Sequence, residues 1–77
     1  MNRYSICSVC DEEIFEKQCS ALEKHIPDLK EVQTHTDVDG SKIKEYILNN
    51  KKISVHNSVY LNEVYIQSEV DLDEIFK

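Results

Sequence analysis

Hydrophobic side chains recur at helical spacing in one long segment near the start of the chain. The intervals are four, three and four residues, in the series Phe15, Cys19, Leu22 and Ile26. These positions fall on one face of a helix. The acidic residues 11–13 suit the positive end of the helix dipole, and Pro27 disfavours helical geometry at the residue before it. The pattern therefore predicts a helix over residues 11–26.

Shorter segments fill the rest of the chain. Residues 3–6 and 29–36 are rich in β-prone side chains, and a turn follows at 37–40. Ile43, Tyr46 and Ile47 follow helical spacing, which predicts a second helix over residues 42–49. The remaining predicted elements are a short strand at 53–55, a hairpin over 59–66 that turns at residues 62 and 63, and a last helix over 71–76.

The predicted order of elements is β-α-β-α-β-β-α, which defines an α/β fold. A strand-helix-strand start favours parallel pairing through a right-handed crossover, and the late hairpin adds antiparallel strands. We therefore expect a mixed sheet covered by helices. No linker or repeat divides the sequence, so residues 1–77 are expected to form a single domain.

Charge and composition narrow the classes of function. Nine Lys and Arg against fifteen Asp and Glu give a net charge of −6. An acidic protein lacks the basic surface that nucleic acids require, and the same sign disfavours anionic membranes. No segment approaches the roughly 20 apolar residues of a membrane span. We expect a cytoplasmic protein that binds neither nucleic acid nor membranes.

Two of the three cysteines form a C-x-x-C motif, Cys7-Ser8-Val9-Cys10, between the first strand and the first helix. In a reducing compartment this motif is typical of redox or metal chemistry. A thiolate near a helix N-terminus is favoured by the dipole and becomes nucleophilic. Cys7 is the predicted nucleophile and Cys10 the resolving thiol, whereas Cys19 lies on the apolar stripe and is predicted to be a core residue.

The element order, together with the position of the motif, resembles the thioredoxin-like fold in its minimal, glutaredoxin-sized form. The resemblance implies a thiol–disulfide oxidoreductase in which Cys7 and Cys10 cycle between dithiol and disulfide. It also implies that His56, Asn57 and Ser58 form the substrate-binding loop opposite the motif. The implied partners are a protein or small-molecule disulfide and a reductase or thiol donor, with no cofactor.

One position departs from that family and keeps an alternative open. Asn57 stands where the family has a cis-proline, and a non-proline cis peptide costs roughly 3–4 kcal/mol. The family proline is thought to keep metal away from the cysteines. The alternative is a non-enzymatic domain that binds a partner protein, or zinc through Cys7 and Cys10, with zinc shared between two chains as one possibility. Two unreactive, buried cysteines are the simplest third interpretation.

Overall fold

The computed structural model describes residues 2–73 of the chain. One helix and five strands follow each other in the order β1-α1-β2-β3-β4-β5. Their bounds are β1 Asn2–Cys7, α1 Glu12–His25, β2 Lys30–Thr36, β3 Lys42–Leu48, β4 Lys51–Ser58 and β5 Glu63–Ser68.

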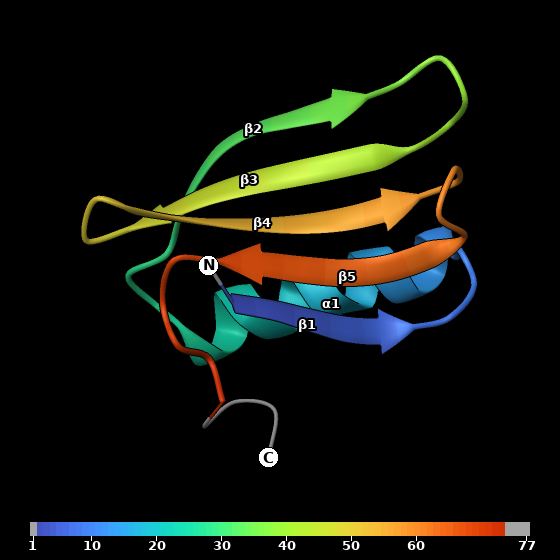
Figure 1. The fold of residues 1–77 in the computed structure, drawn as a ribbon. Coiled ribbons are helices and arrows are strands. Elements are labelled where there is room, and N and C mark those ends of the chain that lie inside the picture. The colour runs from blue at the N-terminus through green and yellow to red at the C-terminus, as the bar shows by residue number, and fades with distance from the viewer. Residues whose placement is uncertain (1, 74–77) are drawn as a thin grey trace.

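All five strands belong to one antiparallel sheet, and the predicted fold class is wrong. The order across the sheet is β1-β5-β4-β3-β2, so the first strand pairs with the last one (Figure 1). The strands β2 to β5 form a continuous meander, and α1 carries the chain from one edge of the sheet to the other. The absence of parallel pairing within residues 2–73 excludes the mixed sheet, and with it the resemblance to the thioredoxin-like fold.

The first helix is confirmed within one residue at each end. Asp11 is its N-cap, and the carboxylate of Asp11 accepts hydrogen bonds from the N–H groups of Glu13 and Ile14. Such a cap satisfies backbone donors that have no partner inside the helix. The chain leaves the helix at Ile26, immediately before Pro27.

The predicted second helix is instead strand β3. Successive side chains of β3 point to opposite faces of the sheet. Tyr46 is buried on the helix side, and its neighbours Glu45 and Ile47 lie on the other face. The Asn49–Asn50 turn then reverses the chain into β4, with φ angles of 51° and 66°. Positive φ at both central residues is what a type I′ hairpin requires.

A late hairpin is present, but it joins β4 to β5, and residues 59–61, which were predicted as its first strand, belong to its turn at residues 59–62. Strand β4 is longer than the predicted strand at 53–55 and runs from residue 51 to residue 58. The predicted last helix is not helical at residues 71–73, and its remaining residues 74–76 lie outside the described residues.

The hydrophobic core lies between α1 and one face of the sheet. The helix contributes the predicted stripe, and the sheet contributes side chains that alternate along β3, β4 and β5. These buried residues are Phe15, Cys19, Leu22, Tyr46, Ile53, Val55 and Ile66, with Leu72 from the C-terminal segment. The helix lies behind β1, β5 and β4 and leaves β2 uncovered (Figure 1). Every residue of β2 is exposed, and the opposite face of the sheet carries no second layer within residues 2–73.

Candidate functional site

Three connections meet at one end of the molecule, which we call the thiol end: residues 8–11, 37–41 and 59–62 (Figure 1). The turn after β4 joins the other two. Its Val59 N–H donates to Ser41 Oγ at 2.9 Å, and its Asn62 Oδ1 accepts from the Cys10 N–H at 3.0 Å. The three connections therefore form one continuous surface.

Both cysteines of the C-x-x-C motif lie at this end. Cys7 is the last residue of β1, and Cys10 lies one residue before the Asp11 N-cap. Both are free thiols and half-buried, and the chain bends at the exposed Ser8 and Val9 between them. The predicted position between a strand and a helix is thus present, but Cys10 precedes the first turn of the helix.

Two asparagines hold the backbone of the cysteine loop. Asn62 accepts the N–H of Cys10, and Asn57 Oδ1 accepts the N–H of Asp11 at 3.1 Å. Asn57 is only 6% exposed and reaches the loop from the middle of the sheet. Neither contact has a signal in the sequence, because the partners are 52 and 46 residues apart. The thiol-bearing loop is therefore fixed by side chains from the last hairpin.

The residues predicted as a substrate loop belong to strand β4, and they point in different directions. Asn57 faces the helix side and holds the cysteine loop, as described above. Ser58 Oγ accepts the N–H of Leu61 at 3.0 Å and so shapes the turn after β4. His56 lies on the opposite face of the sheet from Asn57. The structure thus brings Asn57 to the cysteine loop and places His56 elsewhere.

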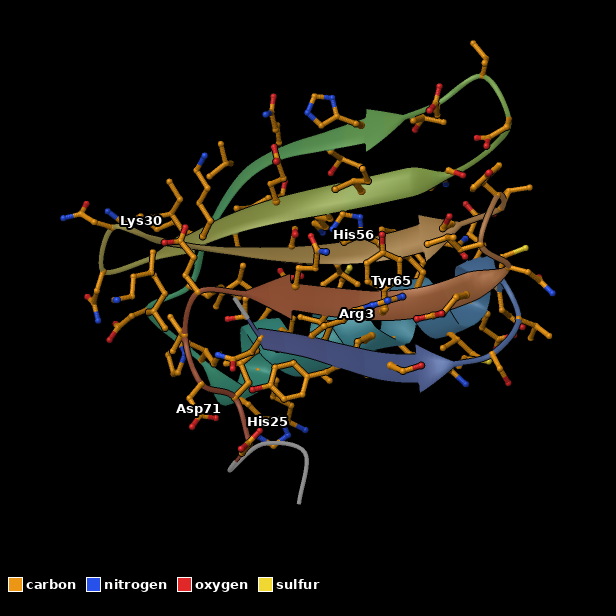
Figure 2. The ribbon with its side chains drawn as sticks, in the orientation of Figure 1. Arg3, His25, Lys30, His56, Tyr65 and Asp71 are labelled. Carbon is orange, nitrogen blue, oxygen red and sulfur yellow. The ribbon has the colours of Figure 1, made fainter. Side chains whose placement is uncertain are left out.

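His56 belongs to a row of side chains on the open face of the sheet. Its ring stacks on Tyr65 with 4.5 Å between centroids, and the Arg3 guanidinium lies 4.4 Å from the centroid of the Tyr65 ring. Figure 2 shows Tyr65 between Arg3 and His56. Burial lowers the pKa of His56, the Glu45 carboxylate opposes that change, and the Arg3 guanidinium adds to it. The surroundings of His56 therefore favour its neutral form over its protonated form.

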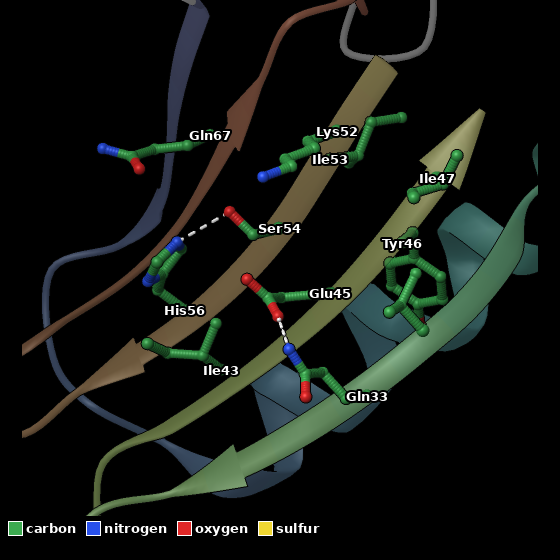
Figure 3. Close-up of a pocket in the computed structure, with 11 residues that line it drawn as sticks. Gln33, Ile43, Glu45, Tyr46, Ile47, Lys52, Ile53, Ser54, His56 and Gln67 are labelled. Atoms are coloured by element: carbon green, nitrogen blue, oxygen red, sulfur yellow. Dashed lines mark hydrogen bonds between the residues drawn. The ribbon is translucent and has the colours of Figure 1, made fainter. Parts of the chain in front are cut away.

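A shallow hollow of about 400 Å³ lies beside His56 on the open face (Figure 3). Ser54 Oγ lies 2.8 Å from His56 Nε2, and Gln33 donates to Glu45 at 2.6 Å across the neighbouring strands. The other residues that line the hollow include Val32, Ile43, Ile47, Lys52 and Gln67. Four of the polar side chains that line the hollow are therefore already paired with each other, Ser54 with His56 and Gln33 with Glu45.

The third cysteine is buried, and the described residues offer no ready-made metal site. Cys19 is 3% exposed in the core, and burial raises the pKa of its thiol. Within residues 2–73, no three His, Cys, Asp or Glu side chains gather closely enough to hold a metal ion. Zinc sites in proteins are almost always four-coordinate. Zinc bound through Cys7 and Cys10 would thus take further ligands from outside this part of the chain.

Comparison with known proteins gives no relative. No family matches this sequence, and neither a curated protein nor a solved structure matches it significantly. Among the described residues, no helix has the length and apolarity needed to cross a membrane. The case for function therefore rests on the site itself.

Proposed function

We propose that this domain carries out thiol–disulfide exchange through Cys7 and Cys10. The observation that carries the proposal is the pairing of two free, half-buried thiols within four residues, on a loop fixed by hydrogen bonds. Cys7 and Cys10 both belong to this fixed loop or its first flanking residue, whereas Cys19 is enclosed in the core. Exchange requires a thiol that a substrate can reach, and Cys7 and Cys10 are partly exposed whereas Cys19 is buried.

The reaction follows from the general chemistry of dithiols. The Cys7 thiolate attacks one sulfur of a substrate disulfide, forming a mixed disulfide and releasing the first substrate thiolate. The Cys10 thiolate then attacks Cys7 Sγ, which releases the second substrate thiolate and leaves a Cys7–Cys10 disulfide. The substrate gains two electrons, and the domain loses two. An external dithiol or thiol donor returns the domain to its reduced form.

The experiment is a redox titration of the purified chain, quenched with acid, alkylated and read by mass spectrometry. We expect a loss of two hydrogens that maps to Cys7 and Cys10 and is reversed by dithiothreitol. Cys10→Ser should accumulate a mixed disulfide at Cys7 with a cystine-bridged peptide, while Cys7→Ser should accumulate none. Cys19→Ser serves as the matched control and should titrate like the unchanged chain.

Two results would contradict the proposal. In the first, Cys7 and Cys10 stay reduced, or form only bridges between chains, under conditions that oxidise free cysteine. In the second, native mass spectrometry of the purified chain finds zinc that protects both thiols from alkylation. That second result would establish the metal-binding alternative.

A further inference from the structure

The thiol end carries an unusual share of exposed hydrophobic surface. Within residues 2–73, six large hydrophobic residues are exposed, and five of them belong to the thiol end. They come from all three connections and are Val9, Val38, Val59, Tyr60 and Leu61. Tyr60 is 88% exposed, and Val9 lies between the two cysteines. Exposed hydrophobic side chains that gather at one end of a protein often mark an interaction site.

Four carboxylates lie at or next to the thiol end, and we call them its rim. Glu12 and Glu13 occupy the first turn of α1, and Asp37 and Asp39 belong to the turn after β2. Lys42 pairs with Glu12, and Lys17 pairs with Glu13. Asp37 and Asp39 bond to backbone N–H groups of their own turn, and the bonds from Ser41 lower the pKa of Asp39. Within residues 2–73 neither Asp37 nor Asp39 forms an ion pair with Lys or Arg, so these two carboxylates supply the negative charge of the rim.

We propose that the thiol end is a docking surface for a polypeptide with apolar side chains flanked by Lys or Arg. The apolar residues fit its centre and the cations complement its rim, which also disfavours acidic ligands. This inference deepens the proposed function, since it names the substrate class as a basic, apolar polypeptide disulfide. Docking itself does not need the thiols, so binding and exchange can be measured separately.

The experiment measures equilibrium binding by fluorescence anisotropy, with two labelled peptides that contain no cysteine. Both have the same apolar centre, and one is flanked by lysines and the other by glutamates. The protein is the full chain, unchanged and as the Cys7→Ser/Cys10→Ser variant. We expect the lysine-flanked peptide to bind about tenfold more tightly at low salt, with the difference shrinking as salt is added. The double variant should bind equally well.

Variants locate the surface. Tyr60→Ser/Leu61→Ser should weaken binding of the lysine-flanked peptide about fivefold or more. Val32→Ser is the matched control, because Val32 is 52% exposed on β2, away from the thiol end, and should change nothing. Circular dichroism checks that each variant folds, which is expected because the replaced side chains are exposed.

The outcomes separate the two proposals. Docking is overturned if neither peptide binds, if both bind equally, or if Val32→Ser weakens binding as much as the turn variant. Exchange is tested independently by the redox titration of Cys7 and Cys10 described above. Peptide binding by a chain whose Cys7 and Cys10 stay reduced in that titration would leave the docking surface established and the redox function refuted.

Discussion

Replacement of Asn57 by alanine tests how the thiol-bearing loop is held. The Asn57 side chain is nearly buried, and its Oδ1 accepts the N–H of the helix N-cap Asp11. Removing the acceptor leaves this partly buried N–H without its partner, at a cost of about 1–3 kcal/mol. A domain of this length has a total stability on the order of 4–12 kcal/mol. The substitution therefore removes a substantial part of it.

Urea unfolding followed by circular dichroism measures the effect. With a urea dependence of about 1 kcal/mol per molar for a small domain, the midpoint should fall by roughly 1–3 M. Asn62→Gly is the comparison, because Asn62 holds the neighbouring Cys10 N–H but is exposed and has a φ of 52°. Glycine tolerates that φ, and water replaces the lost acceptor. We expect a loss of at most about 1 kcal/mol there.

Amide hydrogen exchange adds a local readout. The Asp11 N–H should be protected in the unchanged chain and exchange faster in Asn57→Ala, by a factor larger than the change in global stability explains. The reasoning is wrong if Asn57→Ala and Asn62→Gly shift the urea midpoint equally. It is equally wrong if the Asp11 N–H keeps its protection after the asparagine is removed.

Three further predictions concern the helix cap, a turn and the open face. Asp11→Ala removes the cap of α1 and should lower the free energy of unfolding, measured by thermal unfolding, by about 0.5–2 kcal/mol. An unchanged free energy of unfolding would show that this cap does not stabilise the helix. Asn50→Val should cost about 1–2 kcal/mol because Asn50 has a φ of 66°, whereas Asn50→Gly should retain stability. Burial lowers the pKa of His56, so stability is full above its unfolded value of about 6.5 and falls as pH drops through the folded value. His56→Gln should flatten that slope below about pH 6.5, and an unchanged slope would count against it.

The first helix could be predicted because its signals are local. An apolar stripe, a capping aspartate and a following proline lie within one segment, and none depends on distant residues. The position of the C-x-x-C motif between β1 and α1 follows from the same local signals. Strand β1, strand β2 and the turn at 37–40 were predicted on the same basis.

Strand β3 was predicted as a helix because its seven residues fit both the helical and the strand periodicity. Ile43, Tyr46 and Ile47 satisfy helical spacing, yet Lys42, Lys44 and Tyr46 alternate toward the helix side of the sheet. The β-branched and aromatic residues and the short length favour a strand. The Asn49–Asn50 pair before the next apolar run was the deciding signal, because asparagine tolerates the positive φ of a hairpin turn.

The predicted parallel pairing of the first two strands was wrong for a different reason. A strand-helix-strand order suggests a parallel crossover, but parallel strands are buried on both faces and are nearly continuously hydrophobic. Strand β2, Lys30–Thr36, contains Val32 as its single large apolar residue. Such a strand belongs at an exposed edge, where the structure places it. The composition of β2 is therefore that of an exposed edge strand and argues against parallel pairing.

The candidate site combines a motif that is short in sequence with hydrogen bonds from residues far along the chain. The cysteines come from the first ten residues, while β5 and both asparagines that hold the loop come from beyond residue 56. The contacts that fix the thiol loop therefore join segments more than 45 residues apart, and closing such long-range contacts carries an entropic cost. A fragment that ends at residue 58 contains both thiols but lacks Asn62, which bonds to the loop, and the strand that pairs with β1. Fixation of the thiol pair is consequently coupled to closure of the whole sheet.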